Sequence, residues 1–294
     1  MNVLITGCNG FIGGWIVKTL GQGSCIIGCG VEEHPQYSVD KYIKWNIGEE
    51  EIPIDFNDLK IDAIVHAAAV IDNNDANMNL IKVNCLGTHR IYQLARHKNV
   101  KVVVLIGSIP VIGSPTCISI TENTRVNPLT MYHSTKVMQE MILRQLNKLQ
   151  IRFCSLRIPS PIGPGQKTNT ILPIFLRNAL SNTDLTLYGK GTRKQNYIDV
   201  RDIAFCISLL IKTDSANGIY NLGSDYTISN YELAEKCISL CNSKSKIIFN
   251  GLSDLCDDEN WIIDSSKIKA EIGYAQKYSI EQSIVDMIGE MKKW

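Results

Sequence analysis

The sequence predicts an α/β fold in which a doubly wound, parallel (Rossmann-type) sheet carries a smaller C-terminal substrate-binding lobe. Three observations support this prediction. Runs that are apolar throughout alternate with helical segments over the first two thirds of the 294 residues, and such strands belong to parallel sheets covered on both faces. The segments between the runs are long enough for helical crossovers. A glycine-rich turn follows the first run, where open parallel sheets bind ligands.

Hydrophobic periodicity places the elements of the first two thirds. Strands are expected at residues 3–6, 24–28, 42–45, 63–66, 102–106 and 152–157. Helices are expected between them at residues 11–20, 76–97 and 131–149. A stretch rich in Pro and Gly after Arg157 then leaves the sheet as a loop.

The last third is expected to rest on the sheet and not to form an independent domain. Helices are expected at 170–181, 200–212, 229–241 and 279–292, and extended segments at 185–188, 217–223 and 246–249. We therefore divide the chain into a dinucleotide-binding domain at 1–160 and a mostly substrate-binding lobe at 161–294, from which some segments return to the sheet. A cleft between two such parts is a common ligand site.

Composition excludes several classes of protein. A hydrophobic content of 45%, a charged content of 20% and a net charge of +1 are ordinary for a globular protein and give no reason to expect a nucleic-acid or membrane partner. No apolar run approaches the roughly 20 residues of a membrane span. The chain enters its first strand without a signal peptide, so its ten cysteines are expected to be reduced in the cytoplasm. Cys237 and Cys241 have no second ligand pair beside them, so no metal is expected.

The glycines of the first turn have a spacing that suits a phosphate-bearing ligand. Gly7, Gly10 and Gly13 follow the first apolar run at spacing G-x-x-G-x-x-G. Glycine lets the backbone approach a pyrophosphate, and the helix start offers unpaired N–H groups to that anion. The spacing differs by one residue from the fingerprint G-x-G-x-x-G. Taken alone, the triplet fits a tight turn without a ligand equally well.

Three further residues form a candidate catalytic group. Tyr132 and Lys136 are four residues apart at the start of an expected helix and so lie on one face of it. A nearby ammonium lowers the pKa of a phenol, which can then exchange a proton with a substrate oxygen. Ser108 ends an apolar run, at the sheet edge where ligands bind. A surface pair and a strand-terminating serine are the simpler alternatives.

Seven motifs in order resemble the extended short-chain dehydrogenase/reductase family, and within it the NAD-dependent epimerase/dehydratase group that modifies nucleotide sugars. They are the glycine triplet, residues 62–69, residues 83–88, Ser108, Tyr132 with Lys136, residues 157–165 and residues 189–204. The resemblance implies NAD or NADP as cofactor, a nucleotide-sugar substrate and a homodimer formed through the helices at 76–97 and 131–149. It also implies a place in polysaccharide synthesis.

The resemblance assigns roles to individual positions. Tyr132 would be the acid/base, Lys136 would hold the nicotinamide ribose and lower the pKa of Tyr132, and Ser108 would orient the substrate. Cofactor contacts would come from Gly7, Asn9, Gly10, Phe11, Ile12, Gly13, Asn46, Ile47, Ala67, Ala68, Ala69, Asn84, Tyr132, Lys136 and Pro159. Substrate contacts would come from Ser108, Ile109, Ser160, Arg193 and Tyr197. Capping or packing is the alternative for Asn84, and a ligand-free loop position is the alternative for Arg193.

Four departures from the family pattern carry information. Cys29 and Gly30 stand where many members have an acidic residue for the adenosine ribose, yet no arginine follows, so the choice between NAD and NADP stays open. Ile109 and Pro110 replace the Asp-Glu pair of dehydratases and argue against dehydration, which needs a positioned acid and base. Residues 111–113, at the expected wall of the sugar pocket, read Val-Ile-Gly where the family often has Val-Tyr-Gly. Gln195 stands where many members have an arginine.

The sequence therefore favours a nucleotide-sugar epimerase that removes hydride from a sugar carbon, C4 in our interpretation, and returns it. A reductase of a nucleotide-linked 4-keto-6-deoxy sugar is the first alternative, because the same three residues serve both reactions. A non-catalytic, dinucleotide-binding regulatory protein is the second alternative. It is disfavoured because such a protein is expected to have lost Tyr132 or Lys136, and both are present.

Overall fold

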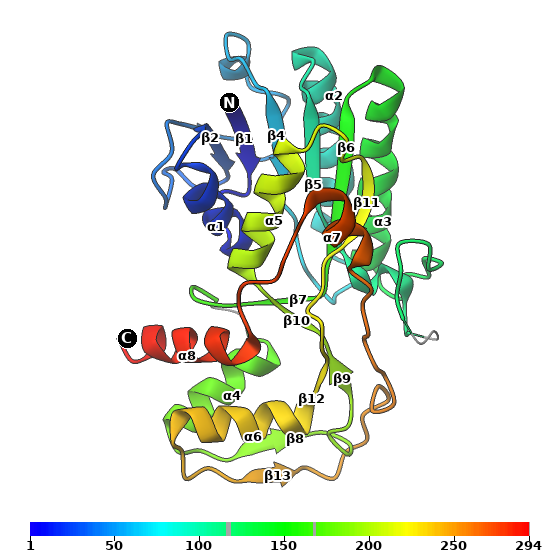
Figure 1. Cartoon of the computed structure of the whole chain (residues 1–294). Coiled ribbons are helices and arrows are strands. Elements are labelled where there is room, and N and C mark those ends of the chain that lie inside the picture. Colours follow the sequence, from blue (N-terminus) through cyan, green and yellow to red (C-terminus); the bar gives the residue numbers. More distant parts are fainter. Residues whose placement is uncertain (116–118, 167–168, 294) are drawn as a thin grey trace.

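A computed structural model of the chain describes residues 1–115, 119–166 and 169–293. Its central feature is a seven-stranded sheet with strand order β11-β6-β5-β4-β1-β2-β3, and every neighbouring pair is parallel (Figure 1). The strands are β1 (Asn2–Thr6), β2 (Cys25–Gly30), β3 (Lys41–Lys44), β4 (Ala63–His66), β5 (Val102–Ser108), β6 (Arg152–Ile158) and β11 (Gly218–Asn221). The doubly wound parallel sheet is confirmed.

Helices cover both faces of this sheet. On one face α1 (Phe11–Leu20) packs against α5 (Val200–Lys212), and on the other α2 (Thr88–Lys98) packs against α3 (Met131–Arg144). Val3 and Ile5 of β1 belong to the core under α1 and α5, whereas Leu4 belongs to the core under α2 and α3. Successive strand residues point to opposite faces, so a strand buried on both must be apolar throughout.

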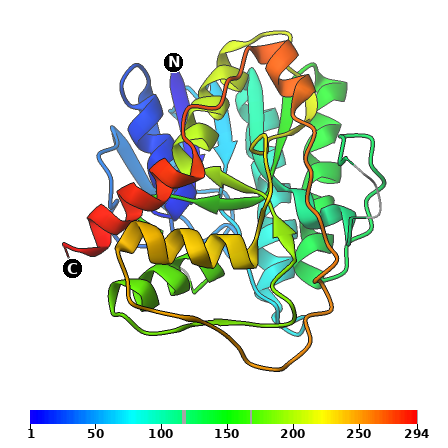
Figure 2. The same cartoon turned by 60° about the horizontal axis from the view of Figure 1, so that its bottom comes forward.

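The remaining helices and strands build the lobe or connect it to the sheet. In Figure 1 the lobe lies below the sheet, and in Figure 2 it is turned toward the viewer. Its own core lies among α4, α6, α8, β8 and β10. The elements are β7 (Ser160–Ile162), α4 (Ile171–Leu180), β8 (Leu185–Leu187), β9 (Lys194–Gln195), β10 (Tyr197–Asp199), β12 (Ile228–Ser229), α6 (Asn230–Cys241), β13 (Ile247–Phe249), α7 (Ser266–Ile272) and α8 (Ile280–Met291).

The second half of the chain contributes to the sheet as well as to the lobe. Strand β11 pairs with β6 at the sheet edge, and α5 lies beside α1. Arg152 at the start of β6 donates hydrogen bonds to the carbonyl oxygens of Leu210, Ile211, Thr213 and Ala216, at 3.0–3.3 Å. The Arg152 side chain thereby donates to the carbonyl groups at the end of α5 and in the turn that leads to β11.

The helix expected at 76–97 is wrong at its start. The chain becomes helical only at Leu80, and residues Leu80–Gly87 form a π-helix before α2 begins. The Asn74 side chain accepts a hydrogen bond from the Ala76 backbone N–H at 3.1 Å, and the Asn77 side chain accepts one from Asn79 N–H at 3.0 Å. These side chains hold the preceding backbone in turns, which compete with helix formation.

Smaller differences concern strand ends and short elements. Strand β2 runs two residues further than the expected 24–28 and ends at Gly30, and α3 continues to Leu149 as a 3-10 helix (Gln145–Leu149). Two further 3-10 turns, Ile54–Phe56 and Ile109–Ile112, and the helix α7 were not expected. Runs of two to seven residues are too short for periodicity to identify.

Candidate functional site

The glycine turn between β1 and α1 is closed too tightly for side chains. A Cβ added to Gly13 would lie 2.0 Å from the carbonyl oxygen of Gly7, and one added to Gly7 would lie 2.9 Å from the backbone nitrogen of Ala68. Gly7 also has φ +67°, which favours glycine. Helix α1 begins at this turn without a side-chain cap on its first N–H groups. The turn thus has the close backbone approach and free donors that a dinucleotide phosphate requires.

A pocket of about 270 Å3 lies beside this turn, at the carboxyl ends of β1, β2 and β4. Eight of the predicted cofactor residues line it: Gly7, Asn9, Gly10, Asn46, Ile47, Ala67, Ala68 and Ala69. Cys29, Gly30 and Glu32 line it as well, and Glu32 is the one charged side chain among the described residues of its wall. The residues present therefore fit the adenosine half of a nicotinamide dinucleotide.

Other predicted cofactor residues lie around this pocket and not in its wall. Phe11 lines a separate hollow of about 440 Å3 with Trp15 and Tyr37. Ile12 packs on the apolar core beneath α1. Pro159 directly follows β6 and is half-buried.

The catalytic candidates come from neighbouring elements. Ser108 is the last residue of β5 and pairs in register with Ile158 of β6. Tyr132 and Lys136 lie in the first two turns of α3, which packs against β5 and the 3-10 turn after it. Thr130 caps α3 by accepting a hydrogen bond from the backbone N–H of His133 at 3.1 Å. The N-terminal end of α3 is therefore fixed next to the end of β5.

Burial sets the protonation of both groups on α3. It raises the pKa of Tyr132 to about 12 and lowers the pKa of the Lys136 ammonium to about 8, while the carboxylate of Glu140 acts in the opposite direction on Lys136. Desolvation of the phenolate raises the pKa of Tyr132, and the expected lowering of this pKa by Lys136 stays a prediction.

A buried ion pair lies beside the face of α3 that carries Lys136. Glu140, one turn beyond Lys136, accepts hydrogen bonds from Arg157 Nε at 2.9 Å and Nη2 at 2.8 Å. The hydroxyl of Ser155 donates to the same carboxylate at 2.8 Å. The sequence analysis missed this group, although the i, i+4 spacing of Lys136 and Glu140 was a signal for it.

Asn84 acts on the cofactor pocket indirectly. Its side chain is fully buried and bonds both the N–H and the carbonyl of Val70, at 2.8 and 2.9 Å, and the hydroxyl of Thr135 at 2.9 Å. Both of its N–H donors are thus occupied. We correct its predicted cofactor contact to a positioning role, since Val70 lines the pocket and Thr135 lies on α3 beside Lys136.

A larger pocket of about 750 Å3 lies in the lobe, where Arg193 and Gln195 face α4 and β8. Arg193 forms an ion pair with Glu259 at 3.2 Å, and its buried Nε has no hydrogen-bond partner among the described residues. The wall consists of Ile171, Ile174, Phe175, Asn178, Thr186, Leu187, Tyr188, Arg193, Gln195, Asn230, Ser253, Asp254 and Leu255. Apolar walls with a few polar groups are typical of small-molecule sites.

The other predicted substrate residues do not line this pocket. Tyr197 lies in the core of the lobe and Ile109 in a core beside the sheet, so for both we correct a predicted contact to a packing role. Tyr197 is in β10, where it pairs in register with Ser160 of β7. Ser160 is half-buried and begins β7, two residues after the end of β6.

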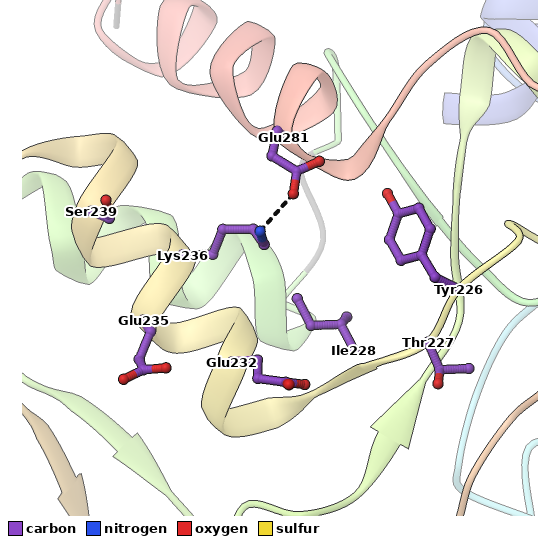
Figure 3. A pocket seen from close by; sticks show the side chains of 8 residues that line it. All are labelled: Tyr226, Thr227, Ile228, Glu232, Glu235, Lys236, Ser239 and Glu281. Carbon is purple, nitrogen blue, oxygen red and sulfur yellow. Dashed lines mark hydrogen bonds and ion pairs between the residues drawn. The ribbon is translucent and has the colours of Figure 1, made fainter.

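A third hollow, of about 500 Å3, lies between α6 and α8 and contains none of the predicted site residues (Figure 3). Three of its four charged side chains, Glu232, Lys236 and Glu281, already have structural partners. Lys236 and Glu281 form an ion pair at 2.5 Å across it, and Glu232 completes the capping box of α6 with Ser229. We therefore assign it no function.

Two absences hold for residues 1–115, 119–166 and 169–293. No three His, Cys, Asp or Glu side chains of these ranges are grouped so as to hold a metal ion. None of their helices has the length and apolar character needed to cross a membrane.

Comparisons with known proteins agree with this geometry. Over 271 residues the chain is 26% identical to dTDP-D-glucose 4,6-dehydratase of Dictyostelium discoideum, covering 81% of this chain and 62% of that protein. It is 27% identical over 325 residues to UDP-glucose 4-epimerase of Lactobacillus helveticus, covering 100% and 97%. The structure of UDP-glucose 4-epimerase from Thermotoga maritima with UDP-glucose superposes with a TM-score of 0.90 at 20% identity, covering 100% and 99%.

The sequence pattern of one family accounts for most of the chain. It matches residues 3–223, from the first strand to just beyond β11. This stretch contains the glycine turn, the pocket at the carboxyl ends of β1, β2 and β4, and the three catalytic candidates on β5 and α3. The chain therefore belongs to the NAD dependent epimerase/dehydratase family.

Proposed function

We propose that this chain is a nucleotide-sugar epimerase that inverts a sugar carbon, C4 in our assignment, with Tyr132 as the acid/base. The observation that carries the choice within the family is the pair of residues after Ser108. Ile109 is fully buried and Pro110 has no ionisable group. Elimination of water needs a second positioned acid and base, whereas inversion needs one proton acceptor that later donates the proton back.

Tyr132 is placed to take and return that proton. The first turn of α3 holds it next to the end of β5, where Ser108 can donate a hydrogen bond to the same sugar oxygen. In the forward half-reaction the Tyr132 phenolate oxygen removes the hydroxyl proton of the sugar. In the return half-reaction the protonated phenol gives it back to the ketone oxygen. Bound NAD would supply the hydride acceptor and donor for the sugar carbon, held by the glycine turn and the pocket at the carboxyl ends of β1, β2 and β4.

Lys136 supplies positive charge next to this phenol. Its burial lowers its pKa to about 8, so it remains mostly protonated at neutral pH. A charged ammonium favours the phenolate of Tyr132 as the proton leaves. Glu140 favours the charged form of Lys136, and Arg157 and Ser155 hold the Glu140 carboxylate in place. These buried partners position the catalytic face and do not touch the substrate.

The lobe pocket is the proposed site for the nucleotide. Its volume of about 750 Å3 is in the range of ligand pockets. Phe175 and Tyr188 offer aromatic rings, and Arg193 is the cation we assign to the diphosphate. The ion pair with Glu259 holds the Arg193 guanidinium and lowers its net attraction for an anion, so part of that pairing must be exchanged for contacts with phosphate.

Chromatographic separation of the products from UDP-glucose and related nucleotide sugars, with mass spectrometry of each separated species, tests the proposal. An epimerase yields an isomer of unchanged mass and needs no added NADH or NADPH. A product lighter by one water would identify a dehydratase, and consumption of a reduced nicotinamide would identify a reductase. Either result would overturn the proposal. If none of these nucleotide sugars is converted, the dinucleotide-binding regulatory protein becomes the better interpretation.

A further inference from the structure

A short segment, residues 259–264, joins the lobe pocket to the chain that follows β5. In Figure 1 it belongs to the orange stretch that rises from β13 to α7. Its first part bonds to β9, because Lys194 N–H donates to the carbonyl oxygen of Glu259 at 2.9 Å and Trp261 N–H donates to that of Lys194 at 3.2 Å. Its second part forms a parallel bridge with Ile120. Since β9 contributes to the wall of the lobe pocket, the segment connects that pocket to the region beyond the end of β5.

One carboxylate oxygen of this segment contacts both Arg193 and Trp261. Glu259 Oε2 lies 3.2 Å from Arg193 Nη2 and accepts a hydrogen bond from Trp261 Nε1 at 3.1 Å. The Glu259 side chain is only 13% exposed, so its charge is largely withdrawn from water. Arg193 Nε is buried and has no hydrogen-bond partner among the described residues. The guanidinium is therefore incompletely paired.

A diphosphate pairs with a guanidinium better than this carboxylate does. Its oxygens can accept two parallel hydrogen bonds from the planar fork of Arg193, and it carries more negative charge than a carboxylate. Glu259 already lies against Nη2 of that fork. The affinity for the diphosphate is thus its attraction to Arg193 less the cost of leaving the Glu259 carboxylate, largely buried, without its cation.

Trp261 connects Glu259 to the residues that follow Ser108. Its indole N–H bonds the Glu259 carboxylate, while the side chain as a whole is 9% exposed and belongs to a small core that includes Ile109. Ile109 directly follows Ser108 and begins the 3-10 turn after β5. Because packed side chains transmit small shifts, a change at the Glu259 carboxylate acts on the indole and through it on this turn.

We propose that Glu259 competes with the substrate's diphosphate for Arg193, and that Trp261 transmits this exchange to the turn after Ser108. Glu259 and Trp261 are then positioning residues, since neither is assigned a contact with the reacting sugar carbon. Capture of the nucleotide in the lobe and the placement of the catalytic serine become linked events. The proposal rests on the proposed function, because it concerns the pocket assigned to the nucleotide, yet equilibrium binding tests it without turnover.

Isothermal titration calorimetry of the full chain with UDP and with inorganic pyrophosphate measures the competition. The variant Glu259→Gln keeps the size of the side chain and an acceptor for Trp261 but removes the charge. It should bind both probes at least about fivefold more tightly, the lower end for coupling between two groups. The matched control is Asp258→Asn, which removes a charge from the exposed neighbouring residue outside the pocket wall. It should change the affinities by less than about twofold.

A double variant shows whether Arg193 is the group for which Glu259 competes. In the Arg193→Gln background, Glu259→Gln should change UDP affinity by less than about twofold, because no guanidinium remains to be released. Equal affinities of Glu259→Gln and the unaltered chain would overturn the competition. The same gain in affinity with and without Arg193 would overturn it as well.

Tryptophan fluorescence tests the transmission, because indole emission responds to the partner of the indole N–H. UDP should change the emission of the unaltered chain. Trp261→Phe should remove most of this change while calorimetry still detects UDP, and the control Trp15→Phe, on α1, should retain it. With a nucleotide sugar that is converted, Trp261→Phe should lower kcat at least about tenfold and leave UDP affinity within about twofold. An unchanged emission response or an unchanged kcat in Trp261→Phe would overturn the role of Trp261.

Turnover separates this inference from the proposed function. Tighter, Arg193-dependent binding in a chain that converts no nucleotide sugar would overturn the proposed function and leave the competition standing. An active epimerase whose UDP affinity does not respond to Glu259→Gln would overturn the inference alone. If neither probe binds to the unaltered chain or to Glu259→Gln, the inference and the assignment of the nucleotide to this pocket are both wrong.

Discussion

The carboxylate of Glu140 on α3 and the guanidinium of Arg157 on β6 form a doubly hydrogen-bonded ion pair that is almost completely buried. Arg157 Nη1 is also buried and has no hydrogen-bond partner among the described residues. The pair connects α3 to the sheet one turn beyond Lys136.

We expect Glu140→Gln to destabilise the chain by about 3–5 kcal/mol, because it leaves the Arg157 charge buried without a counter-charge. The measurement is urea unfolding. The double variant Glu140→Gln with Arg157→Met should recover part of the loss, since the orphaned charge is removed. Equal stability of the single and double variants would contradict this explanation and would indicate that the lost packing, not the charge, determines the cost.

Lys136→Met should be more stable than the unaltered chain at pH 7, by about 2–4 kcal/mol, although it should be inactive. Folding lowers the pKa of Lys136 from 10.5 to about 8. Below pH 8 the ammonium is charged in both states and folding carries the full cost of dehydrating it. Between pH 8 and 10.5 the unfolded chain binds more protons, so stability rises with pH.

The advantage of Lys136→Met should therefore shrink across that window, which unfolding curves at pH 7, 9 and 10.5 would measure in the absence of cofactor. If the stability difference between Lys136→Met and the unaltered chain does not vary with pH, burial of the Lys136 ammonium does not destabilise the folded chain.

Tyr132→Phe should reduce turnover by at least about 100-fold, the lower range for general acid–base catalysis, while NAD affinity stays nearly the same. The hydroxyl is the group that exchanges the proton, and the ring keeps its packing on His133 at a centroid separation of 5.3 Å. Product assays and calorimetry with NAD measure the two effects separately. Turnover at the unaltered rate would remove Tyr132 from the mechanism. Lys136→Ala, by contrast, should weaken NAD binding and turnover together.

Acid should destabilise the chain through His66. Burial lowers the pKa of His66 from 6.5 to about 3, and its ring nitrogens bond the hydroxyls of Thr6 and Thr88 at 2.8 and 2.9 Å. Below pH 6.5 the unfolded chain binds a proton that the folded chain does not, so stability falls with falling pH, by up to about 1.4 kcal/mol per unit. His66→Gln should give a lower but flatter profile between pH 6.5 and 5. Parallel profiles would assign the acid sensitivity to other groups.

The helix pair α2 and α3 is proposed to form the homodimer interface. Met138 and Met141 on α3 are 46% and 59% exposed and, three residues apart, lie on one face of the helix. Met138→Lys with Met141→Lys should yield a monomer of unaltered fold in light scattering after gel filtration. Val285→Lys on α8, a control of similar exposure at 47%, should leave the assembly unchanged. A monomeric unaltered chain would refute the interface.

Local patterns in the sequence predict the features that depend on neighbouring residues. The glycine turn, the strands that are apolar throughout and the Tyr132–Lys136 spacing each lie within a few residues, so periodicity and spacing identify them. The pocket beside Gly7 accordingly contains eight of the residues predicted for it.

Features that join distant residues could not be predicted in the same way. The bond between Asn9 and Glu32 and the pair of Glu140 with Arg157 depend on how α3, β6 and the loop after β2 are brought together. Tyr197 was assigned to the substrate from its motif, yet its strand turns it into the lobe core. Tertiary packing decides which face of so short a strand is buried, and two or three residues carry too little periodicity to reveal it.

The position of β11 at the edge of the sheet has a consequence for the order in which the chain can fold during synthesis. The apolar face of the sheet that α5 covers stays open until residues 200–212 leave the ribosome. The edge of β6 has no partner strand until residues 218–221 leave it. Unpaired edges and open apolar faces promote aggregation. A nascent chain stalled near residue 160 should therefore need a chaperone, and a fragment ending there should be insoluble when expressed alone.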